Sequence, residues 1–426
     1  MIGVRAEDSG VVGRFALWLR PFDMEWYPYI ALVVVLGQAL FLFHAIRNYR
    51  YALAKLTRGR PLIYRPRVAL IVPCKGLDAN FGSNIRSLFE QQYNNYRLFF
   101  VVGDESDPAC GELRRITETL RQKSEVLDVS VLVAGPSTSS SQKIHNLLHV
   151  IGRVGDDTQV LAFADSDVCV PRDWLSRLVW PLRRRQCGLT TGYRWFVPTR
   201  GNLASLVLSA VNASVAQLLG NSRFNQAWGG SMAVRAEDFR RLELPHIWKT
   251  TLSDDLSLSR AVRRAGMKVT FVPGCLVASL ESTTWPAFCE FARRQFLITR
   301  IYTPGTWWLG LLSNLASVAG LWGGGALALY VAVRGAENLL PYVAVPVIFC
   351  LGQLFRAVLR QRMALNTLAE YRSQLAPTAW ADILGSWLWS LLLLLALLSS
   401  AFGRTIRWRG IRYKLISPTH TQILDG

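Results

Sequence analysis

The sequence predicts an α/β domain that is held between hydrophobic helices. Short β-rich runs alternate with helical patterns from about residue 68 to residue 300. An apolar stretch without charges precedes this block, and several apolar segments follow it. The alternation is typical of parallel strands joined by helical crossovers, and the flanking stretches have the character of membrane helices.

The composition favours a membrane protein with a basic cytoplasmic face. The 426 residues carry a formal charge of +19, and 51% of them are hydrophobic. The basic residues crowd beside the apolar segments, as the positive-inside rule describes. No nucleic-acid motif accompanies them, so we expect no nucleic-acid partner. The seven cysteines occur singly, which suits a reducing compartment and argues against a disulfide scaffold.

The first apolar stretch predicts a transmembrane anchor over residues 26–46, after an N-terminal segment of residues 1–25. It runs from Trp26 to Ile46 without a charge and has aromatic residues at its beginning. Residues 47–67 form a linker whose charged side chains are all Lys or Arg. This linker should lie in the cytoplasm, which places the N-terminus outside.

A second membrane zone is expected over residues 306–403, with apolar segments at Trp307–Val333, Pro341–Phe355 and Ala379–Phe402. We expect two or three of these segments to span. Pro341–Phe355 is short and contains two prolines, so a re-entrant or interfacial segment is the alternative. Three spans would place the tail, residues 404–426, outside, but its basic residues favour the cytoplasm, which we prefer.

Within the α/β block, charged residues follow the ends of expected strands. We expect strands at Val68–Val72, Leu98–Val102, Val129–Val133 and Val160–Phe163, and a helix at Asn84–Gln92. Ligands in open α/β sheets bind beyond the carboxyl ends of strands. The residues placed there are Lys75, Asp78, Asp104, Asp107, Asp165 and Asp167.

Asp165 and Asp167 flank one serine directly after a buried strand. Two carboxylates in this position can hold a divalent cation, which neutralises charge on a leaving nucleotide. The alternative is a solvated turn, because Asp and Ser are common turn residues.

The second acid cluster is Ser253-Asp254-Asp255, which opens an expected helix that closes at Gly266. The acids in the first turn are helix-capping residues on the simplest interpretation. A carboxylate at a helix start can also accept a proton from an attacking hydroxyl group. The two interpretations are compatible.

Three weaker patterns stay open. Gly229-Gly230-Ser231 is a turn or a loop that approaches a ligand closely. Arg294 and Gln295 belong to a phosphate-binding group or to a basic collar at the membrane surface. The apolar segment Leu203–Gly220 is a core helix or an interfacial helix at a lipid opening.

In order and spacing these motifs resemble ceramide glucosyltransferase and its bacterial relatives, including the hopanoid-type glycosyltransferases. The matching strings are Lys75-Gly76-Leu77-Asp78, Asp107-Pro108-Ala109, Lys143-Ile-His-Asn146-Leu, Asp165-Ser166, Asp255 and the tail Arg404-Thr-Ile-Arg-Trp408-Arg-Gly410-Ile-Arg-Tyr413-Lys-Leu. The resemblance covers residues 68–415. It implies a GT-A, or nucleotide-diphospho-sugar transferase, domain over residues 68–305. It also implies a UDP-sugar donor, Mg²⁺ or Mn²⁺, inversion at the anomeric carbon, and a lipid acceptor in the cytoplasmic leaflet.

Carried over by position, the resemblance gives roles to individual residues. Asp107 is expected near the uridine, and Asp165 near the sugar diphosphate and the metal, with Asp167 as the second acid. Asp255 is expected to be the general base, and Asp254 stands where many relatives have Glu. The expected substrate-binding residues are Lys75, Asp78, Asp107, Lys143, Asp165, Gly229, Ser231, Arg294, Gln295, Trp408, Arg409 and Tyr413.

The chain departs from the family pattern at one element, an Arg-Trp pair that follows Gln or Arg and two variable residues. The nearest match begins at Arg294 and lacks the pair, while a shifted alignment uses Arg300. Two rival functions stay open: transfer to a polyprenyl phosphate or a growing polysaccharide, and nucleotide-sugar binding without turnover.

Overall fold

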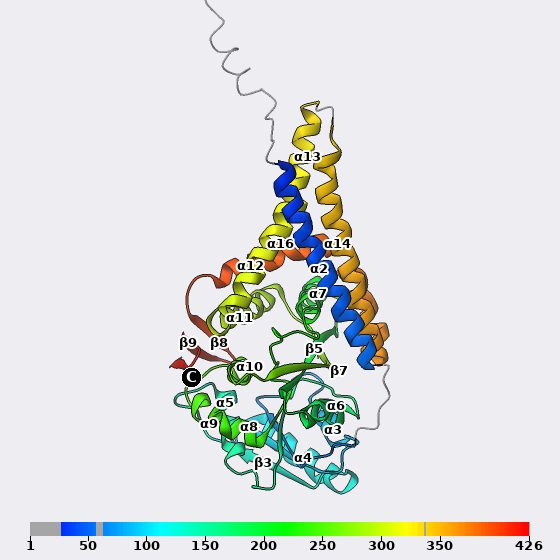
Figure 1. The fold of residues 1–426 in the computed structure, drawn as a ribbon. Helices are drawn as coiled ribbons and strands as arrows, with labels where there is room; N and C mark the ends of the chain where they lie inside the picture. The colour runs from blue at the N-terminus through cyan, green and yellow to red at the C-terminus, as the bar shows by residue number, and fades with distance from the viewer. Residues whose placement is uncertain (1–26, 57–62, 336–337, 426) are drawn as a thin grey trace, which may run out of the picture.

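The computed structural model describes residues 27–56, 63–335 and 338–425 (Figure 1). The expected segment 1–25, Trp26 and residues 57–62 of the basic linker lie outside the described residues.

The α/β block is built on a mixed seven-stranded sheet in the order β3-β2-β1-β4-β6-β5-β7. Strands β1 to β4 are mutually parallel where they pair, and β6 runs antiparallel to both of its neighbours. The expected strands are present with slightly wider bounds. The strands are β1 Val68–Pro73, β2 Tyr96–Val102, β3 Asp128–Val133, β4 Val160–Ala164, β5 Cys187–Pro198, β6 Ser231–Arg235 and β7 Lys268–Glu281.

Helices cover both faces of the sheet, and alternate residues of each strand enter different cores. In β1, Val68, Leu70 and Val72 join one apolar cluster, while Ala69 and Ile71 join the cluster on the opposite face. The helices of this block are α3 Phe81–Phe89, α4 Pro108–Leu120, α5 Gln142–Ile151, α6 Trp174–Val179, α7 Leu203–Ala216, α8 Ala236–Arg241, α9 Leu244–Trp248 and α10 Asp254–Arg264.

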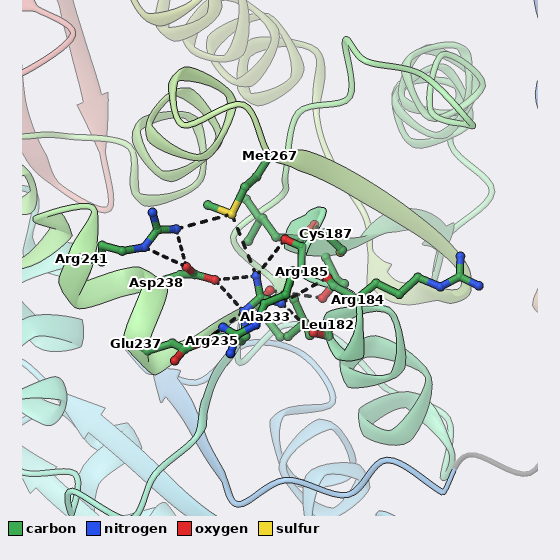
Figure 2. Close-up of polar contacts among 12 residues, drawn as sticks. Leu182, Arg184, Arg185, Cys187, Ala233, Arg235, Glu237, Asp238, Arg241 and Met267 are labelled. Carbon is green, nitrogen blue, oxygen red and sulfur yellow. Dashed lines mark hydrogen bonds and ion pairs between the residues drawn. The ribbon is translucent and has the colours of Figure 1, made fainter.

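The last residue of β6, Arg235, is buried and is held by several polar contacts (Figure 2). Arg235 donates to Asp238 Oδ2 and to the carbonyl of Leu182, both at 2.6 Å. Arg241 donates to the other carboxylate oxygen of Asp238, at 2.6 Å. Asp238 thus neutralises a guanidinium group that also ties the start of α8 to the segment before β5.

The tail forms a separate antiparallel sheet in the order β10-β9-β8, from β8 Thr405–Trp408, β9 Ile411–Ser417 and β10 His420–Asp425. The backbone N–H of Thr421 donates to the carbonyl of Thr250 at 2.8 Å. The Thr250 hydroxyl in turn donates to the Thr419 carbonyl at 2.6 Å. The tail therefore packs against the α/β block just before α10.

Within the part of the chain that the structure describes, three helices are long and apolar enough to cross a membrane, as judged by length and composition. They are α2 Tyr27–Leu56; residues 304–333, which contain α12 Pro304–Val318 and α13 Gly324–Val333; and α14 Leu340–Thr367. Helix α11, Trp285–Tyr302, leads from the α/β block into them. In Figure 1 they project together from one end of the molecule.

Pro341–Phe355 is not a short segment, because the helix α14 that contains it continues to Thr367 and is long enough to span. Pro341 lies in the first turn, where a helix needs no N–H donor. Beyond Phe355 the helix continues through polar and basic residues, which the apolar pattern alone does not include.

The segment Ala379–Phe402 is two helices rather than one straight span. Helices α15 Arg372–Leu384 and α16 Ser386–Ser400 meet at an angle of 85°. A Cβ atom on Gly385 would lie 2.5 Å from the ring of Trp389, so the bend requires glycine. In Figure 1, α16 runs across the base of the projecting helices.

Asp382 holds this bend by accepting from three side chains. Arg360 Nε donates to Asp382 Oδ2 at 2.6 Å, and a second guanidinium nitrogen bonds the other oxygen. Gln361 Nε2 donates at 2.6 Å and Trp389 Nε1 at 2.8 Å. Arg360 and Asp382 are both buried, so each charge depends on the other.

We expect Asp382→Ala to lower the free energy of unfolding by about 3–5 kcal/mol, because Arg360 would stay buried without its carboxylate. The control is Asp425→Ala, which removes an exposed pair with Arg412 and should cost less than about 1 kcal/mol. Unfolding of the full chain in detergent micelles measures both values. Equal losses for the two variants would contradict the assignment.

Candidate active site

The two acid clusters meet at one edge of the large sheet. Strands β1 and β4 end at this edge, and β6 begins there because it runs antiparallel, with Ser231 opposite Ala164. The loop of Trp228, Gly229 and Gly230 therefore lies beside Asp165. Helix α10, which carries the second acid cluster, begins against the same loop.

Lys143 joins the two clusters. It lies in the first turn of α5, whose N-cap Ser141 accepts from the backbone N–H of Ile144 at 3.3 Å. Its Nζ lies 2.7 Å from Asp165 Oδ1 and 3.2 Å from Asp254 Oδ2. One ammonium group thus bridges carboxylates that are far apart in the sequence.

The bridge leaves the two carboxylates with different proton affinities. Burial raises the pKa of Asp254 to about 6, although Lys143 acts in the opposite direction. Burial also acts to raise the pKa of Asp165, but the charges of Lys143 and Arg194 outweigh it and lower that pKa. The pKa of Lys143 is raised, since the carboxylates of Asp165 and Asp254 outweigh the effect of its burial.

Asp255 lies half-buried in the first turn of α10. Its Oδ1 accepts from the Ser253 hydroxyl and from the backbone N–H of Leu256, and its Oδ2 accepts from the N–H of Gly229 at 3.1 Å. A carboxylate has about four lone-pair positions, so Oδ2 keeps one acceptor position. Asp255 is therefore oriented by the backbone and can still take a proton.

The glycine pair lets the backbone approach the acids closely. A Cβ atom on Gly229 would lie 2.4 Å from Asp254 Oδ2 and 2.8 Å from Lys143 Nζ. A Cβ atom on Gly230 would lie 2.6 Å from Asp165 Oδ2. A larger residue at Gly229 would require Asp254 or Lys143 to shift, and one at Gly230 would require Trp228 or Asp165 to shift.

Asp167 faces a cation that the sequence analysis did not select. Arg194 in β5 lies 3.4 Å from Asp167 Oδ2, and its guanidinium group stands over Trp228, 5.1 Å from the ring centroid. Burial raises the pKa of Asp167 to about 6, against the effect of Arg194. The sequence offered one indication of a role for Arg194. It is a charged residue between Tyr193 and Trp195 in a strand, and charged residues are rare in buried strands.

The donor set of Asp165 and Asp167 fits a divalent cation that is shared with a phosphorylated ligand. Mg²⁺ sites of this kind use one or two carboxylates and complete the shell with water and phosphate oxygens. Asp167 Oδ1 is buried and has no hydrogen-bond partner among the described residues. The same residues contain no cluster of three His, Cys, Asp or Glu side chains suited to a metal.

The tail closes one side of the site through Arg409. Its guanidinium group pairs with Asp78 at 3.0 and 3.2 Å, and its carbonyl accepts from Lys75 Nζ at 2.7 Å. Asp107 holds the loop beneath, because its Oδ1 accepts from the N–H groups of Gly76 and Ala109, both at 2.9 Å. Asp107 is thus also the N-cap of α4.

The other predicted residues of the tail and of α11 differ in how far they are buried. Arg294 stands over the Trp408 ring, 5.8 Å from its centroid. Tyr413 is buried, and its hydroxyl oxygen accepts from the N–H of Gln142 at 3.3 Å. Gln295 is exposed and does not join the group. Arg300 donates to the carbonyls of Ala401 and Gly403, so the shifted alignment would place its arginine at the tail junction.

Ser231 lies in the core rather than in the site, contrary to the prediction. Its side chain is fully buried, and its hydroxyl oxygen accepts from Trp174 Nε1 at 2.9 Å. Side chains alternate along a strand, so the first residue of β6 points away from the ligand edge although its backbone lies there.

Comparison with known families identifies the type of protein. The model of glycosyl transferase family 21 matches residues 30–420, nearly the whole chain. The ceramide glucosyltransferase of Komagataella phaffii is 25% identical over 162 residues, which are 36% of this chain and 31% of that protein. The matched part thus spans about a third of the relative. With the family match, the seven-stranded mixed sheet confirms the predicted GT-A α/β domain, with apolar helices on both sides of it in the sequence.

Two solved structures are more distant. The mannosyltransferase PcManGT of Pyrobaculum calidifontis, solved with GDP-Man and Mn²⁺, has a TM-score of 0.46 and 16% identity, covering 88% of this chain and 97% of its own. GalNAc-T7, solved with UDP, GalNAc and Mn²⁺, has a TM-score of 0.38 and 14% identity, covering 55% of this chain and 51% of its own. At these scores their ligands imply nothing for this chain.

We expect Gly229→Ala to lower the free energy of unfolding by about 1–3 kcal/mol, because the added methyl group overlaps Asp254 and Lys143. Gly82→Ala is the matched control, since a Cβ atom there meets nothing within 4 Å and the residue lies in α3. Thermal unfolding of both variants measures the difference. A Gly229→Ala protein as stable as the control would show that the backbone can retreat.

Proposed function

The chain belongs to glycosyl transferase family 21, and we propose that it is an inverting membrane glycosyltransferase. It moves a sugar, glucose or a related hexose, from a UDP-sugar to the hydroxyl group of a lipid. The observation that carries this proposal is the Lys143 bridge. Because it joins Asp165 to Asp254, it places the acids suited to a leaving diphosphate beside those suited to an attacking hydroxyl group.

The reaction is a single displacement. Asp255 Oδ2 takes the proton from the lipid hydroxyl group, the oxygen attacks C1 of the sugar, and UDP leaves from the opposite face. The N–H of Gly229 and the hydroxyl of Ser253 fix the orientation of the base. Lys143 keeps Asp254 in place beside it.

The leaving group departs on the side of Asp165 and Asp167. A divalent cation, Mg²⁺ or Mn²⁺, bound by these two carboxylates would neutralise charge on the departing diphosphate. Arg194 and Lys143 add fixed positive charges next to the same acids. The protein therefore supplies cations to the side of the site where negative charge develops.

The contact between tail and domain supports a cytoplasmic tail. Thr421 bonds to Thr250 and Arg409 pairs with Asp78, so tail and domain lie on one side of a membrane. The chain must then cross an even number of times between them. Residues 304–333 and α14 are long enough to supply two crossings, and an even number then requires that the bent α15–α16 pair does not cross. The basic residues after α2 and in the tail support a cytoplasmic position for this side.

This topology assigns each segment of the chain a position relative to the membrane. The apolar part of α2 anchors the protein, and the basic residues that follow begin within α2, which ends at Leu56. Residues 68–305 are the cytoplasmic catalytic domain, residues 306–403 form the second membrane zone, and residues 404–426 form a cytoplasmic tail. The lipid acceptor reaches the site from the cytoplasmic leaflet.

Product analysis with the purified full chain in mixed micelles tests the function. UDP release from a panel of UDP-sugars is measured with and without a cellular lipid extract, and mass spectrometry identifies any glycolipid. Lipid-dependent UDP release with a new glycolipid is expected. Tight UDP binding without release under any condition would favour a non-catalytic binding protein.

Asp255→Asn should lower the turnover number by about 10²-fold or more, because Asn cannot accept the proton. The affinity for UDP should stay within about twofold, since Asn keeps the size and part of the hydrogen bonding of Asp. Asp156→Asn, on an exposed loop, serves as the control. Wild-type turnover in a folded Asp255→Asn protein would refute the base assignment.

Chelation of divalent cations should abolish turnover and weaken UDP binding by about tenfold or more, because the diphosphate would then face Asp165 and Asp167 directly. Addition of Mg²⁺ or Mn²⁺ should restore both. Calorimetry of UDP binding provides the readout that is independent of turnover. Full turnover after exhaustive chelation would exclude the metal.

A further inference from the structure

Arg356 is a charged residue inside one of the candidate membrane spans. It lies in α14, directly after the apolar run that ends at Phe355. Among the residues that the structure describes, its guanidinium group forms no ion pair and no hydrogen bond, and its Nε atom is buried. The guanidinium group stands over the ring of Phe41 in α2, whose centroid lies 6.0 Å away. The proposed transfer reaction makes no use of this charge.

The contact with Phe41 places the guanidinium group of Arg356 beside the apolar part of α2. Helices α2 and α14 lie side by side and run in the same direction (Figure 1). The stacked rings of Tyr27 and Tyr342, 4.6 Å apart, join their first turns, and Phe41 meets Arg356 about four turns further on. The first charged residue of α2 is Arg47, six residues after Phe41. This spacing is about 9 Å along a helix, so Arg356 lies nearer the membrane interior than the basic end of α2.

The surrounding sequence supplies Arg356 with no carboxylate. Neither α2 nor α14 contains Asp or Glu, and the linker that follows α2 contains none either. The buried acid of the neighbouring helix α15 is Asp382, whose two oxygens already accept from Arg360, Gln361 and Trp389. Arg360, one turn further along α14, has the same charge as Arg356 and adds repulsion.

A guanidinium group at this depth requires an anion. A charge loses its hydration in the hydrocarbon region, so an ionisable residue there pairs with a counter-charge or extends toward the interface. The phosphates of the cytoplasmic leaflet lie at that interface. The planar fork of an arginine matches the oxygens of a phosphate in geometry as well as in charge. A phospholipid can therefore supply the charge that these helices lack.

The side chains near Arg356 suit the rest of such a lipid. Leu351 and Phe355 of α14 and Phe43 of α2 are large apolar residues that are exposed. Acyl chains can pack against them while the phosphate contacts Arg356. The carbonyl of Arg356 also accepts from Gln217 Nε2, at the end of α7, at 3.0 Å. A lipid bound here would thus lie where the membrane helices meet the α/β domain.

We propose that Arg356, together with the contact between α2 and α14 at Phe41, binds the phosphate of one anionic phospholipid from the cytoplasmic leaflet. The lipid is a structural ligand. It neutralises Arg356 and stabilises the junction of α2, α14 and the end of α7. The proposal goes beyond the transfer reaction and holds whether or not the chain transfers a sugar.

The charges around Arg356 favour an anionic headgroup over a zwitterionic one. Arg47 and Arg50 of α2 are exposed on the cytoplasmic side of Phe41, and Arg360 follows in α14. The ammonium group of phosphatidylcholine would lie among these cations, which would repel it. The glycerol headgroup of phosphatidylglycerol carries no positive charge, so its phosphate retains a full negative charge for Arg356.

The test measures lipid binding and stability of the full chain purified in a non-ionic detergent. Native mass spectrometry should show one retained phosphatidylglycerol per chain, and added phosphatidylglycerol should raise the unfolding temperature. Arg356→Met removes the charge but keeps a long side chain, and it should weaken phosphatidylglycerol binding by about tenfold or more. In detergent without lipid, the same variant should be at least as stable as the wild type, because it removes an unpaired charge.

Arg362→Met is the matched control, because Arg362 is an exposed arginine of the same helix. It should keep the wild-type affinity for phosphatidylglycerol. The proposal is overturned if a folded Arg356→Met protein binds phosphatidylglycerol as the wild type does, or if Arg362→Met weakens binding equally. It is also overturned if phosphatidylcholine or inorganic phosphate stabilises the wild type as strongly as phosphatidylglycerol. Lower stability of Arg356→Met in lipid-free detergent would show that the protein itself compensates the charge, which likewise rejects the site.

Discussion

The bridge from Lys143 to Asp165 and Asp254 is the interaction on which the site depends. The two carboxylates are buried near each other, and without the ammonium group their mutual repulsion and lost hydration would favour separation or protonation. The bridge lowers the pKa of Asp165, while burial still raises that of Asp254 to about 6. The two neighbouring acids therefore differ in their affinity for a proton. Asp255, the proposed base, lies in the same first turn of α10 as Asp254, so its position is tied to the bridge.

Backbone features, rather than further side chains, keep the bridge in place. Strand β6 runs antiparallel, which brings Gly229 and Gly230 to the edge where β4 ends. A Cβ atom at either position would overlap a bridged carboxylate, so glycine lets this backbone approach the acids. On the other side, the tail reaches the start of α5, where the Tyr413 hydroxyl accepts from the N–H of Gln142, next to Lys143. The C-terminal tail is therefore a structural part of the catalytic edge.

Many residues at this edge could be predicted, because the ends of buried strands can be recognised in the sequence. Runs such as Val68–Val72 are apolar throughout, and the side chains that follow them must lie at the carboxyl edge. The direction of a side chain was harder to predict from the sequence. Ser231 lies at the edge, but its side chain is buried in the core. Arg194 was missed because its contact with Asp167, 27 residues away in the sequence, is not local information. The glycine bend at Gly385 was hidden inside an apolar run that satisfies a membrane helix by composition alone.

The closure of the site by the tail also constrains the membrane part. Because Arg409 and Tyr413 must reach β1 and α5, the chain has to return to the side from which α11 left. A third full crossing would carry them to the opposite side, however apolar its sequence. The Asp382 cluster holds α15 and α16 at 85°, at the cost of burying an ion pair, and in the proposed topology this bend replaces a third crossing. In the proposed arrangement, α16 then lies along the membrane surface, with its apolar residues packed against α7 and α11 of the domain.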